Sequence, residues 1–253
     1  MLFYLVDFMA FKEGDFVEIE YSSWTTADNR MIDTTDQKLA EKNGALVEGR
    51  KYGPVLVIVG KRTVVKGLDD ALKTMDLNQQ KKVTLKPAEA FGERNPDIVR
   101  IMPLAEFKKR DINPYPGMRV NIDNVTATVK SINSGRVVVD ANHPYAGMEI
   151  TYDVKITKKL DQQQDKITAL GKTYDVQPSG VKSEAKAVTL QFGDSVKKDA
   201  DYFIGRANLI AAVFGYFNDV EKVKVEEEYN RPKESDKEEA HEHDHEHDHD
   251  HAH

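Results

Sequence analysis

The sequence predicts an α+β protein built from three folded units and a charged tail. In roughly the first ninety residues, short runs with alternating apolar side chains surround one short helical pattern, which is typical of an α+β fold. A proline-broken, strand-rich stretch follows, and a third region combines two strand patterns with one long helix. The 253 residues exceed a typical domain of about 100–200 residues, so the chain can bury more than one core.

The first region predicts strands on either side of a short helix. From Val17 to Tyr21, apolar residues alternate with glutamates, as in a half-buried strand. Val55–Val59 and Val83–Leu85 are also strand-like. Between them, Val64–Leu72 has apolar residues at 65, 68 and 72, the spacing of one helix face.

The second region begins near Asn95, where prolines become frequent and the pattern of the first region stops. Four prolines break it, and three strands are predicted within it, at Met118–Ile122, Val125–Ile132 and Arg136–Val139. A short turn at 133–135 joins the last two strands. The chain then returns to strict alternation over 150–156, which predicts one more half-buried strand.

The third region begins after a polar break at Asp161–Asp165. Ala187–Phe192 and Val220–Val225 are predicted strands, and Asp199–Phe217 is a predicted helix. Its apolar stripe consists of Phe203, Ala207, Ile210, Phe214 and Phe217. Because Leu209, Ala211 and Val213 lie off this stripe, we expect the helix to meet its own sheet on one side and another domain or a second subunit on the other. The alternative is a helix that is simply well buried.

Composition excludes several classes of protein. The net charge of −7 comes from the segment Lys233–His253, which leaves 34 basic and 34 acidic residues in the rest of the chain and gives no sign of nucleic-acid binding. The absence of cysteine excludes disulfides, thiolate metal sites and cysteine nucleophiles. No apolar run approaches the ~20 residues of a membrane span. The opening segment lacks a basic start and a cleavage motif, so we expect a cytoplasmic protein.

Familiar catalytic motifs are incomplete. A serine–histidine triad would have to use His143, the single histidine outside the tail, in a predicted turn before Pro144. Gly171-Lys172-Thr173 imitates a phosphate-binding loop, but the required earlier glycine is replaced by Lys166. The neighbouring Asp69 and Asp70 point in different directions on a helix, and we expect both to be solvated charges at its start.

Five short strings follow one another in the first two regions. The strings are Glu18-Ile19-Glu20-Tyr21, Met31-Ile32-Asp33-Thr34-Thr35-Asp36, the segment Val64–Leu72, Pro87-Ala88-Glu89-Ala90-Phe91-Gly92-Glu93 and Asn142-His143-Pro144-Tyr145-Ala146-Gly147. In their order and approximate spacing, they together resemble the FKBP-type prolyl isomerases of the SlyD-like, long prokaryotic kind. The resemblance covers roughly Phe11 to Leu160.

The resemblance implies an FKBP-like antiparallel sheet that wraps a short helix, built from 10–94 and 142–160. The intervening residues 95–141 would form an insert-in-flap domain that holds unfolded chain, although their prolines and apolar strands suit an ordinary small β core equally well. Residues 166–230 would form a separate C-terminal α+β domain, and 233–253 a disordered, acidic, histidine-rich tail.

The resemblance also implies a pocket with a polar member and apolar walls. Asp33, Tyr21 and Phe91 would be catalytic, with Asp33 near the substrate carbonyl and within reach of the Tyr21 hydroxyl. The substrate-binding residues would be Ile32, Val55, Val64, Val65, Leu68 and Tyr152. Without the resemblance, the apolar residues would be assigned to the core, and Asp33 to a turn.

Three pocket positions depart from the best-known eukaryotic pattern. Leu68 replaces an aromatic floor, Phe91 replaces a tyrosine and so lacks its hydroxyl, and Ile32 replaces phenylalanine. We expect activity to survive these changes, while affinity for macrolide inhibitors is in question. The stretch Gln37–Tyr52 is longer than in the shortest family members, and the sequence does not indicate its role.

The chain ends in a histidine-rich segment. Every second residue from 241 to 253 is a histidine, with Glu, Asp or Ala between, and neutral imidazoles suit nickel, zinc or copper. A solvated tail or a purification addition is the alternative to a native metal site. The candidate ligands are His241, His243, His245, His247, His249, His251 and His253.

The sequence therefore predicts a peptidyl-prolyl cis–trans isomerase that is also a folding chaperone. Its partners would be unfolded or proline-containing polypeptides, with no nucleic acid, no membrane and no cofactor needed for catalysis, and its C-terminal domain would bind clients or form a homodimer. A non-catalytic holdase and a metal carrier that works through the tail are the alternatives.

Overall fold

The computed structural model describes residues 11–123, 125–193 and 197–230. The chain divides into two compact units, which meet in the sequence between Leu160 and Asp161. The predicted histidine ligands of the tail and the opening residues 1–10 lie outside the described residues. In the described parts of the chain, no helix is long and apolar enough to cross a membrane.

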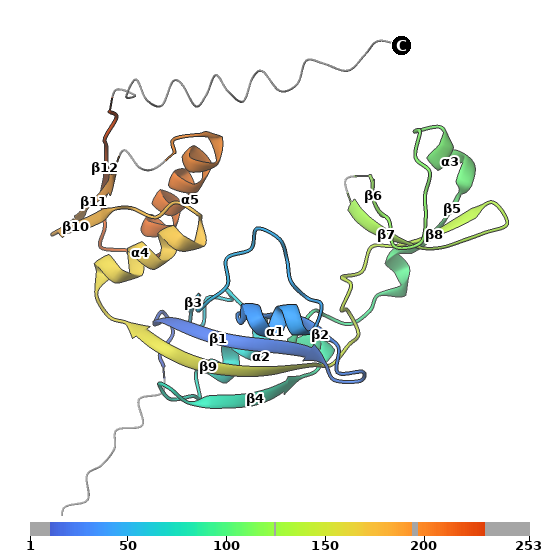
Figure 1. Cartoon of the computed structure of the whole chain (residues 1–253), viewed down its shortest axis with the longest axis horizontal. Coiled ribbons are helices and arrows are strands. Elements are labelled where there is room, and N and C mark those ends of the chain that lie inside the picture. The colour runs from blue at the N-terminus through green and yellow to red at the C-terminus, as the bar shows by residue number, and fades with distance from the viewer. Residues whose placement is uncertain (1–10, 124, 194–196, 231–253) are drawn as a thin grey trace, which may run out of the picture. The chain divides into compact units, whose positions relative to one another are not determined.

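An antiparallel sheet of five strands forms the body of the first unit (Figure 1). The strand order is β2-β1-β9-β4, and β3 pairs with the first residues of β1. Of the five, β2 is the strand that alternation did not predict. The strands are β1 (Phe16–Thr25), β2 (Met31–Thr34), β3 (Val55–Ile58), β4 (Gln80–Leu85) and β9 (Ile150–Leu160).

The predicted short helix is α2 (Lys66–Leu72), and its apolar face packs on the sheet. Leu68 and Leu72 are buried in one cluster with Val17 and Ile156. Full burial of such a side chain stabilises the fold by about 1.5–3 kcal/mol. Two further short helices, α1 (Gln37–Lys42) and η1 (Pro87–Glu89), flank the sheet strands in the sequence.

The prediction that Asp69 is a solvated helix charge is wrong. Asp69 is fully buried, and its carboxylate accepts hydrogen bonds from the backbone N–H groups of Gly60 at 2.7 Å and Arg62 at 3.2 Å. Both partners have positive φ, 78° and 56°. The tight turn leaves these donors without a strand partner, and a buried donor needs an acceptor. Asp70 is half-buried and pairs with Lys73 at 3.0 Å.

An inserted sheet of four strands, in the order β5-β8-β7-β6, lies between β4 and β9 in the sequence. Its last three strands confirm the predicted ones, and the β7–β8 turn uses Ser134 and Gly135, both with positive φ, as two-residue hairpins require. The sequence did not predict β5 and α3. The elements are η2 (Pro96–Ile98), β5 (Val99–Pro103), α3 (Leu104–Lys108), β6 (Arg119–Ile122), β7 (Val125–Asn133) and β8 (Arg136–Asp140).

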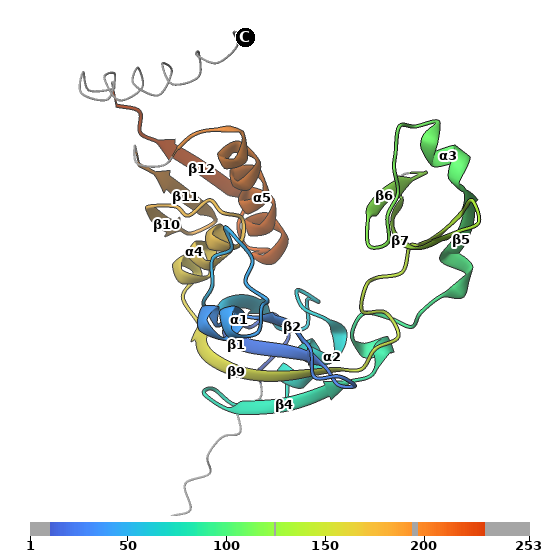
Figure 2. The ribbon, with the colours of Figure 1, turned by 45° about the vertical axis from the view of Figure 1, so that its right-hand side comes forward.

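Two connecting segments join the insert to the main sheet (Figure 2), and hydrogen bonds hold them together. The Asn95 N–H donates to Asn142 Oδ1, and Asn142 Nδ2 donates to the Asn95 carbonyl, both at 2.8 Å. Arg94 pairs at 2.7 Å with Asp140, whose side chain is 3% exposed. The two connecting segments therefore form one hydrogen-bonded junction between the insert and the main sheet.

The second unit combines a three-stranded sheet with two helices. The strand order is β10-β11-β12, with β10 and β11 antiparallel and β11 and β12 parallel. The segment 161–165, which was expected to be a polar break, contains the start of α4. The elements are α4 (Gln163–Thr173), β10 (Gly180–Glu184), β11 (Ala187–Phe192), α5 (Ala200–Tyr216) and β12 (Lys222–Glu227).

The predicted helix is α5, but most of its predicted apolar stripe lies away from the core, with Phe217 as the buried exception. Phe203 and Phe214 are 44% and 45% exposed, and the buried face instead contains Tyr202, Gly205, Leu209, Ala212 and Val213. A Cβ on Gly205 would lie 2.5 Å from the Tyr174 carbonyl, so the helix packs closely through its small residues. The idea of a merely well-buried helix is also wrong, because a second apolar face is exposed.

Candidate active site

The polar centre of the predicted site joins three elements. Tyr21 comes from β1 and Asp33 from β2, where Asp33 pairs with Ser23, so Asp33 is a strand residue and not a turn residue. The Tyr21 hydroxyl donates to Asp33 Oδ2 at 2.5 Å, and the Thr34 N–H donates to Asp33 Oδ1 at 2.8 Å. Arg50 forms an ion pair with Asp33 Oδ1. The carboxylate is thereby held at both oxygens.

The electrostatics of this centre follow from burial and from the Asp33 charge. Burial and the neighbouring Asp33 raise the pKa of Tyr21 well above its ordinary value, so its hydroxyl stays protonated and donates. Burial and the same charge raise the pKa of Tyr152, on β9, to about 12. The hydrogen bond from Arg50 to Asp33 raises the pKa of Arg50. The centre therefore contains one negative and one positive charge, with two neutral tyrosines beside them.

Sequence reasoning missed Arg50, and the structure gives the stretch 37–52 a role. Arg50 lies 5.2 Å above the Tyr52 ring, and the Tyr52 hydroxyl accepts a hydrogen bond from the Val47 N–H at 3.0 Å. The Gly53 N–H then donates to the Thr35 carbonyl at 2.9 Å. This longer stretch thus places the Arg50 guanidinium against the Asp33 carboxylate. The only sequence signal was an arginine within a segment of unassigned function.

The predicted apolar residues gather beside this centre. Leu68 and Tyr152 belong to the buried core, at 1% and 5% exposure. The ring centroids of Tyr21 and Tyr152 are 5.9 Å apart. The remaining predicted members pack against the same cluster and are partly buried: Tyr21, Ile32, Val55, Val64, Val65 and Phe91.

Phe91 belongs to an aromatic group that the sequence did not predict. Its ring stacks on His143 with a centroid distance of 4.4 Å and an interplanar angle of 3°. Tyr145 contacts both rings, with centroids at 5.5 Å from Phe91 and 5.8 Å from His143. The motif around Asn142 carried the only signal, and there His143 was considered for a triad alone.

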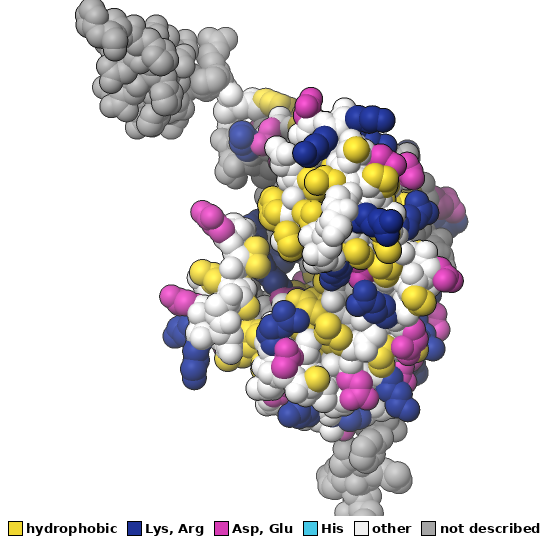
Figure 3. Space-filling view, turned by 90° about the vertical axis from the view of Figure 1, so that its right-hand side faces the viewer, with side chains coloured by type: hydrophobic (Ala, Val, Ile, Leu, Met, Phe, Trp, Pro, Cys, Tyr) yellow, Lys and Arg dark blue, Asp and Glu magenta, His cyan; other side chains and the backbone are white. Residues whose placement is uncertain are grey.

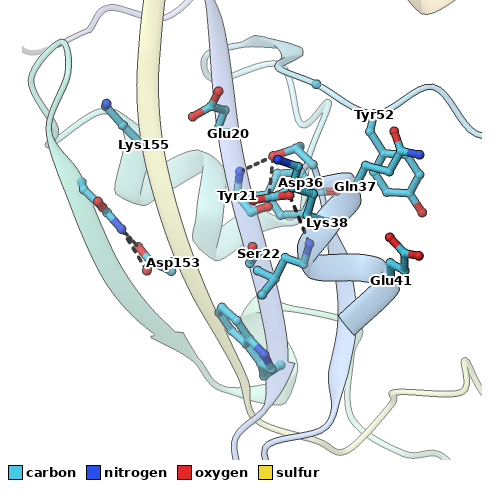
Figure 4. Close-up of a pocket in the computed structure, with 15 residues that line it drawn as sticks. Glu20, Tyr21, Ser22, Asp36, Gln37, Lys38, Glu41, Tyr52, Asp153 and Lys155 are labelled. Carbon is cyan, nitrogen blue, oxygen red and sulfur yellow. Dashed lines mark hydrogen bonds between the residues drawn. The ribbon is translucent and has the colours of Figure 1, made fainter. Parts of the chain in front are cut away.

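A groove of about 860 Å³ lies against α1, and most of its strand residues belong to the opposite face of the sheet (Figure 4). Successive strand residues face opposite sides, so Glu20, Ser22 and Trp24 line this groove from the other face of β1. Tyr21 and Tyr52 also line it, so the groove borders the site described above. Asp153 and Lys155 line it from β9, and α1 contributes Gln37, Lys38, Leu39 and Glu41. Its walls are mostly polar, unlike those of the predicted site.

Among the described residues, no three histidine, cysteine, aspartate or glutamate side chains cluster as metal ligands. The seven predicted ligands belong to the tail, outside this part of the chain.

Comparison with known proteins places the chain in a family. A family model described as FKBP-type peptidyl-prolyl cis-trans isomerase matches residues 9–108, and one described as FKBP26, IF domain, matches residues 100–145. The chain belongs to the FKBP-type peptidyl-prolyl cis-trans isomerases, and it is SlyD-like.

Three relatives show the extent of the similarity. A short-type peptidyl-prolyl cis-trans isomerase of Methanocaldococcus jannaschii is 28% identical, over 57% of this chain and 91% of the relative. A probable FKBP-type 16 kDa peptidyl-prolyl cis-trans isomerase of Pseudomonas fluorescens is 31% identical, over 46% and 79%. The FKBP-type isomerase SlyD of Pasteurella multocida is 28% identical, over 50% and 65%.

Proposed function

We propose that the pocket around Asp33 catalyses rotation about X-Pro bonds by binding the twisted amide more tightly than the planar one. Asp33, Tyr21 and Phe91 are the catalytic residues. The proline ring binds against Ile32, Val55, Val64, Val65, Leu68 and Tyr152. The observation that carries this proposal is the Tyr21–Asp33–Arg50 network at the edge of an apolar, partly open cluster.

The chemistry needs no nucleophile and no cofactor. An X-Pro amide is planar because of resonance, and the rotation barrier is about 18–20 kcal/mol. A pocket that prefers the twisted amide by about 1.36 kcal/mol accelerates rotation tenfold. Twisting withdraws the nitrogen lone pair from the carbonyl and leaves its carbon more electron-poor. A carboxylate fixed near that carbon, in a dry pocket, stabilises the twisted form.

A chaperone activity is proposed for the insert. A groove of about 210 Å³ in this sheet is lined by Ile98, Ile122, Val125, Ala127, Val139 and Ala141, with Arg100 and Asp123 beside it. Ile101 and Val125 are 66% and 52% exposed. Apolar side chains also reach the surface in patches on the face of the molecule in Figure 3. Extended apolar segments of unfolded chains suit such a surface.

The functional division by segment follows from these proposals. Residues 10–94 and 142–160 perform isomerisation, 95–141 hold unfolded chain, and 166–230 associate with a second copy or with clients. Support for the last role is the exposed apolar face of α5, which includes Phe203, Ile204 and Phe214. Work in the cytoplasm and metal binding by the tail stay predictions, as does the metal-carrier alternative, in which truncation after Pro232 abolishes function and spares isomerisation.

The test of catalysis is cis–trans exchange of an Ala-Leu-Pro-Phe peptide measured by NMR. We expect the intact protein to accelerate exchange and the Asp33→Ala, Phe91→Ala double variant to lose the acceleration. If the folded intact protein does not accelerate exchange, the enzyme proposal fails for simple peptides and the non-catalytic holdase takes its place.

The chaperone proposal has a separate test. The Val125→Asp variant should suppress aggregation of an unfolded client less well than the intact protein, with peptide exchange unchanged. Thr126→Asp, which adds the same charge at an exposed position of the same strand outside the groove, is the control. Equal suppression by the Val125→Asp variant and the intact protein would contradict a client site in this groove.

A further inference from the structure

The wall of the pocket at Phe91 lacks a polar group of its own, because phenylalanine carries no hydroxyl. A polar side chain lies directly against it. The imidazole of His143 is stacked face to face on the Phe91 ring, at a centroid distance of 4.4 Å. His143 itself is exposed, so a bound polypeptide can reach its edge.

The backbone on both sides of His143 is fixed. Before it, Asn142 is bonded to Asn95 in both directions, and its own N–H donates to Asp140 Oδ1 at 2.9 Å. After it, the Gly147 N–H donates to the Gly92 carbonyl at 2.9 Å, one residue beyond Phe91. The two ring-bearing segments are therefore tied together, and the stack is part of the framework.

One hydrogen bond selects the imidazole tautomer. The Tyr145 N–H donates to His143 Nδ1 at 3.2 Å, so Nδ1 is the acceptor. A neutral imidazole then carries its proton on Nε2. Burial against its neighbours and the charge of Arg119 lower the pKa of His143, which favours this neutral form at pH 7. Among the residues that the structure describes, no acceptor is bonded to Nε2.

We propose that His143 is a substrate-binding residue of the isomerase pocket, and that its Nε2–H donates a hydrogen bond to a backbone carbonyl of the bound polypeptide beside Phe91. This inference rests on the proposed function of the pocket. It adds a fixed donor at the one wall where the aromatic side chain is purely hydrocarbon, and it selects for an extended substrate whose carbonyl faces that wall.

Three variants distinguish the loss of the His143 hydrogen-bond donor from the loss of ring stacking on Phe91. His143→Phe keeps a flat ring against Phe91 and removes the donor, so we expect kcat/KM for Ala-Leu-Pro-Phe peptides to fall by about three- to tenfold, as for loss of a neutral hydrogen bond. Phe91→Tyr in the His143→Phe background supplies a hydroxyl at the same wall and should restore kcat/KM to within about twofold. Phe91→Tyr alone gives the reference value for this rescue, and Asp153→Ala, on the opposite face of the sheet, is the control and should change little.

The imidazole nitrogens provide a readout that does not depend on turnover. In 15N NMR of the full chain, the His143 signals are those lost in the His143→Phe variant. We expect Nδ1 to have the shift of an unprotonated nitrogen, and the protonated Nε2 to shift when peptide saturates the protein.

The outcomes are distinct. Activity of His143→Phe equal to that of the intact protein, or an unmoved Nε2 signal at saturation, would overturn the donor role and leave the proposed function intact. A loss that Phe91→Tyr does not restore would show a packing defect, which also overturns it. An intact protein without any isomerase activity would overturn both.

Discussion

The two faces of the main sheet come from the same strands and have opposite character. The inner face is the one on which α2 packs. There, Tyr21 and Tyr152 lie beside apolar side chains, and the Asp33 carboxylate contacts Tyr21 and Arg50. On the outer face, Glu20 and Lys155 lie opposite each other in the β1–β9 register, and Asp153 accepts two hydrogen bonds from Gln80. Alternation along a strand is enough to create both faces.

This difference bears on where the proposed catalysis can take place. The outer groove is spacious, but its charges are exposed to water, where ionic contacts contribute little. The inner site places one fixed carboxylate against apolar surface, where a charge acts strongly on a nearby dipole. We therefore expect substitutions on the two faces to have very different effects.

The largest contrast is expected between two carboxylates. Asp33→Ala should slow the catalysed refolding of a proline-limited protein by about ten- to a hundredfold, the cost of a lost charged interaction. Asp153→Ala, its counterpart on the outer face, should stay within about twofold of the intact protein. Stopped-flow refolding traces measure both. Equal losses in the two variants would show that the inner face has no special role.

A second contrast concerns the helix under the inner face. Asp69→Ala leaves two buried backbone N–H groups without an acceptor, so the free energy of unfolding should fall by about 1–3 kcal/mol. Asp70→Ala removes a partly exposed contact with Lys73 and should leave the free energy of unfolding nearly unchanged. Urea denaturation compares the two variants. A stable Asp69→Ala variant would contradict the burial of that carboxylate.

Arg50 and Lys155 provide a smaller contrast between cations. Arg50→Gln frees one oxygen of Asp33, and we expect kcat/KM for a proline peptide to fall by about three- to tenfold because the carboxylate is less well fixed. Lys155→Gln on the outer face should leave kcat/KM unchanged. A protease-coupled peptide assay gives both values. An unchanged kcat/KM in Arg50→Gln would show that Arg50 is not needed to hold the Asp33 carboxylate in place.

The smallest expected effect is on the pH dependence. Burial and Asp33 raise the pKa of Tyr21 above the ordinary tyrosine value of about 10. Because the hydroxyl remains protonated, kcat/KM should stay flat between about pH 7 and 10. A pH–rate profile tests this. A fall near pH 10 that is absent in Tyr21→Phe would show that the hydroxyl ionises normally.

Apolar patterns in the sequence predicted four of the five strands of the main sheet, and the family resemblance predicted the grouping of Tyr21 with Asp33. The sequence did not predict Arg50, which contacts Asp33 although the two residues are 17 positions apart, with α1 and a loop between them. Periodicity also failed on α5, because it selects the bulkiest face, whereas packing uses the face with Gly205 and Ala212. The burial of Asp69 depended on a distant turn with unpaired N–H groups, which no local pattern shows.

The central claim is that proline substrates bind on the inner face. Trp24 is the single tryptophan and lines the outer groove, so its indole N–H gives one NMR signal for that face. Ile32 reports on the inner site through its δ1 methyl group. On titration with an Ala-Leu-Pro-Phe peptide, we expect the Ile32 methyl signal to shift and the Trp24 indole signal to remain in place. A shifted Trp24 signal with an unmoved Ile32 signal would contradict the claim.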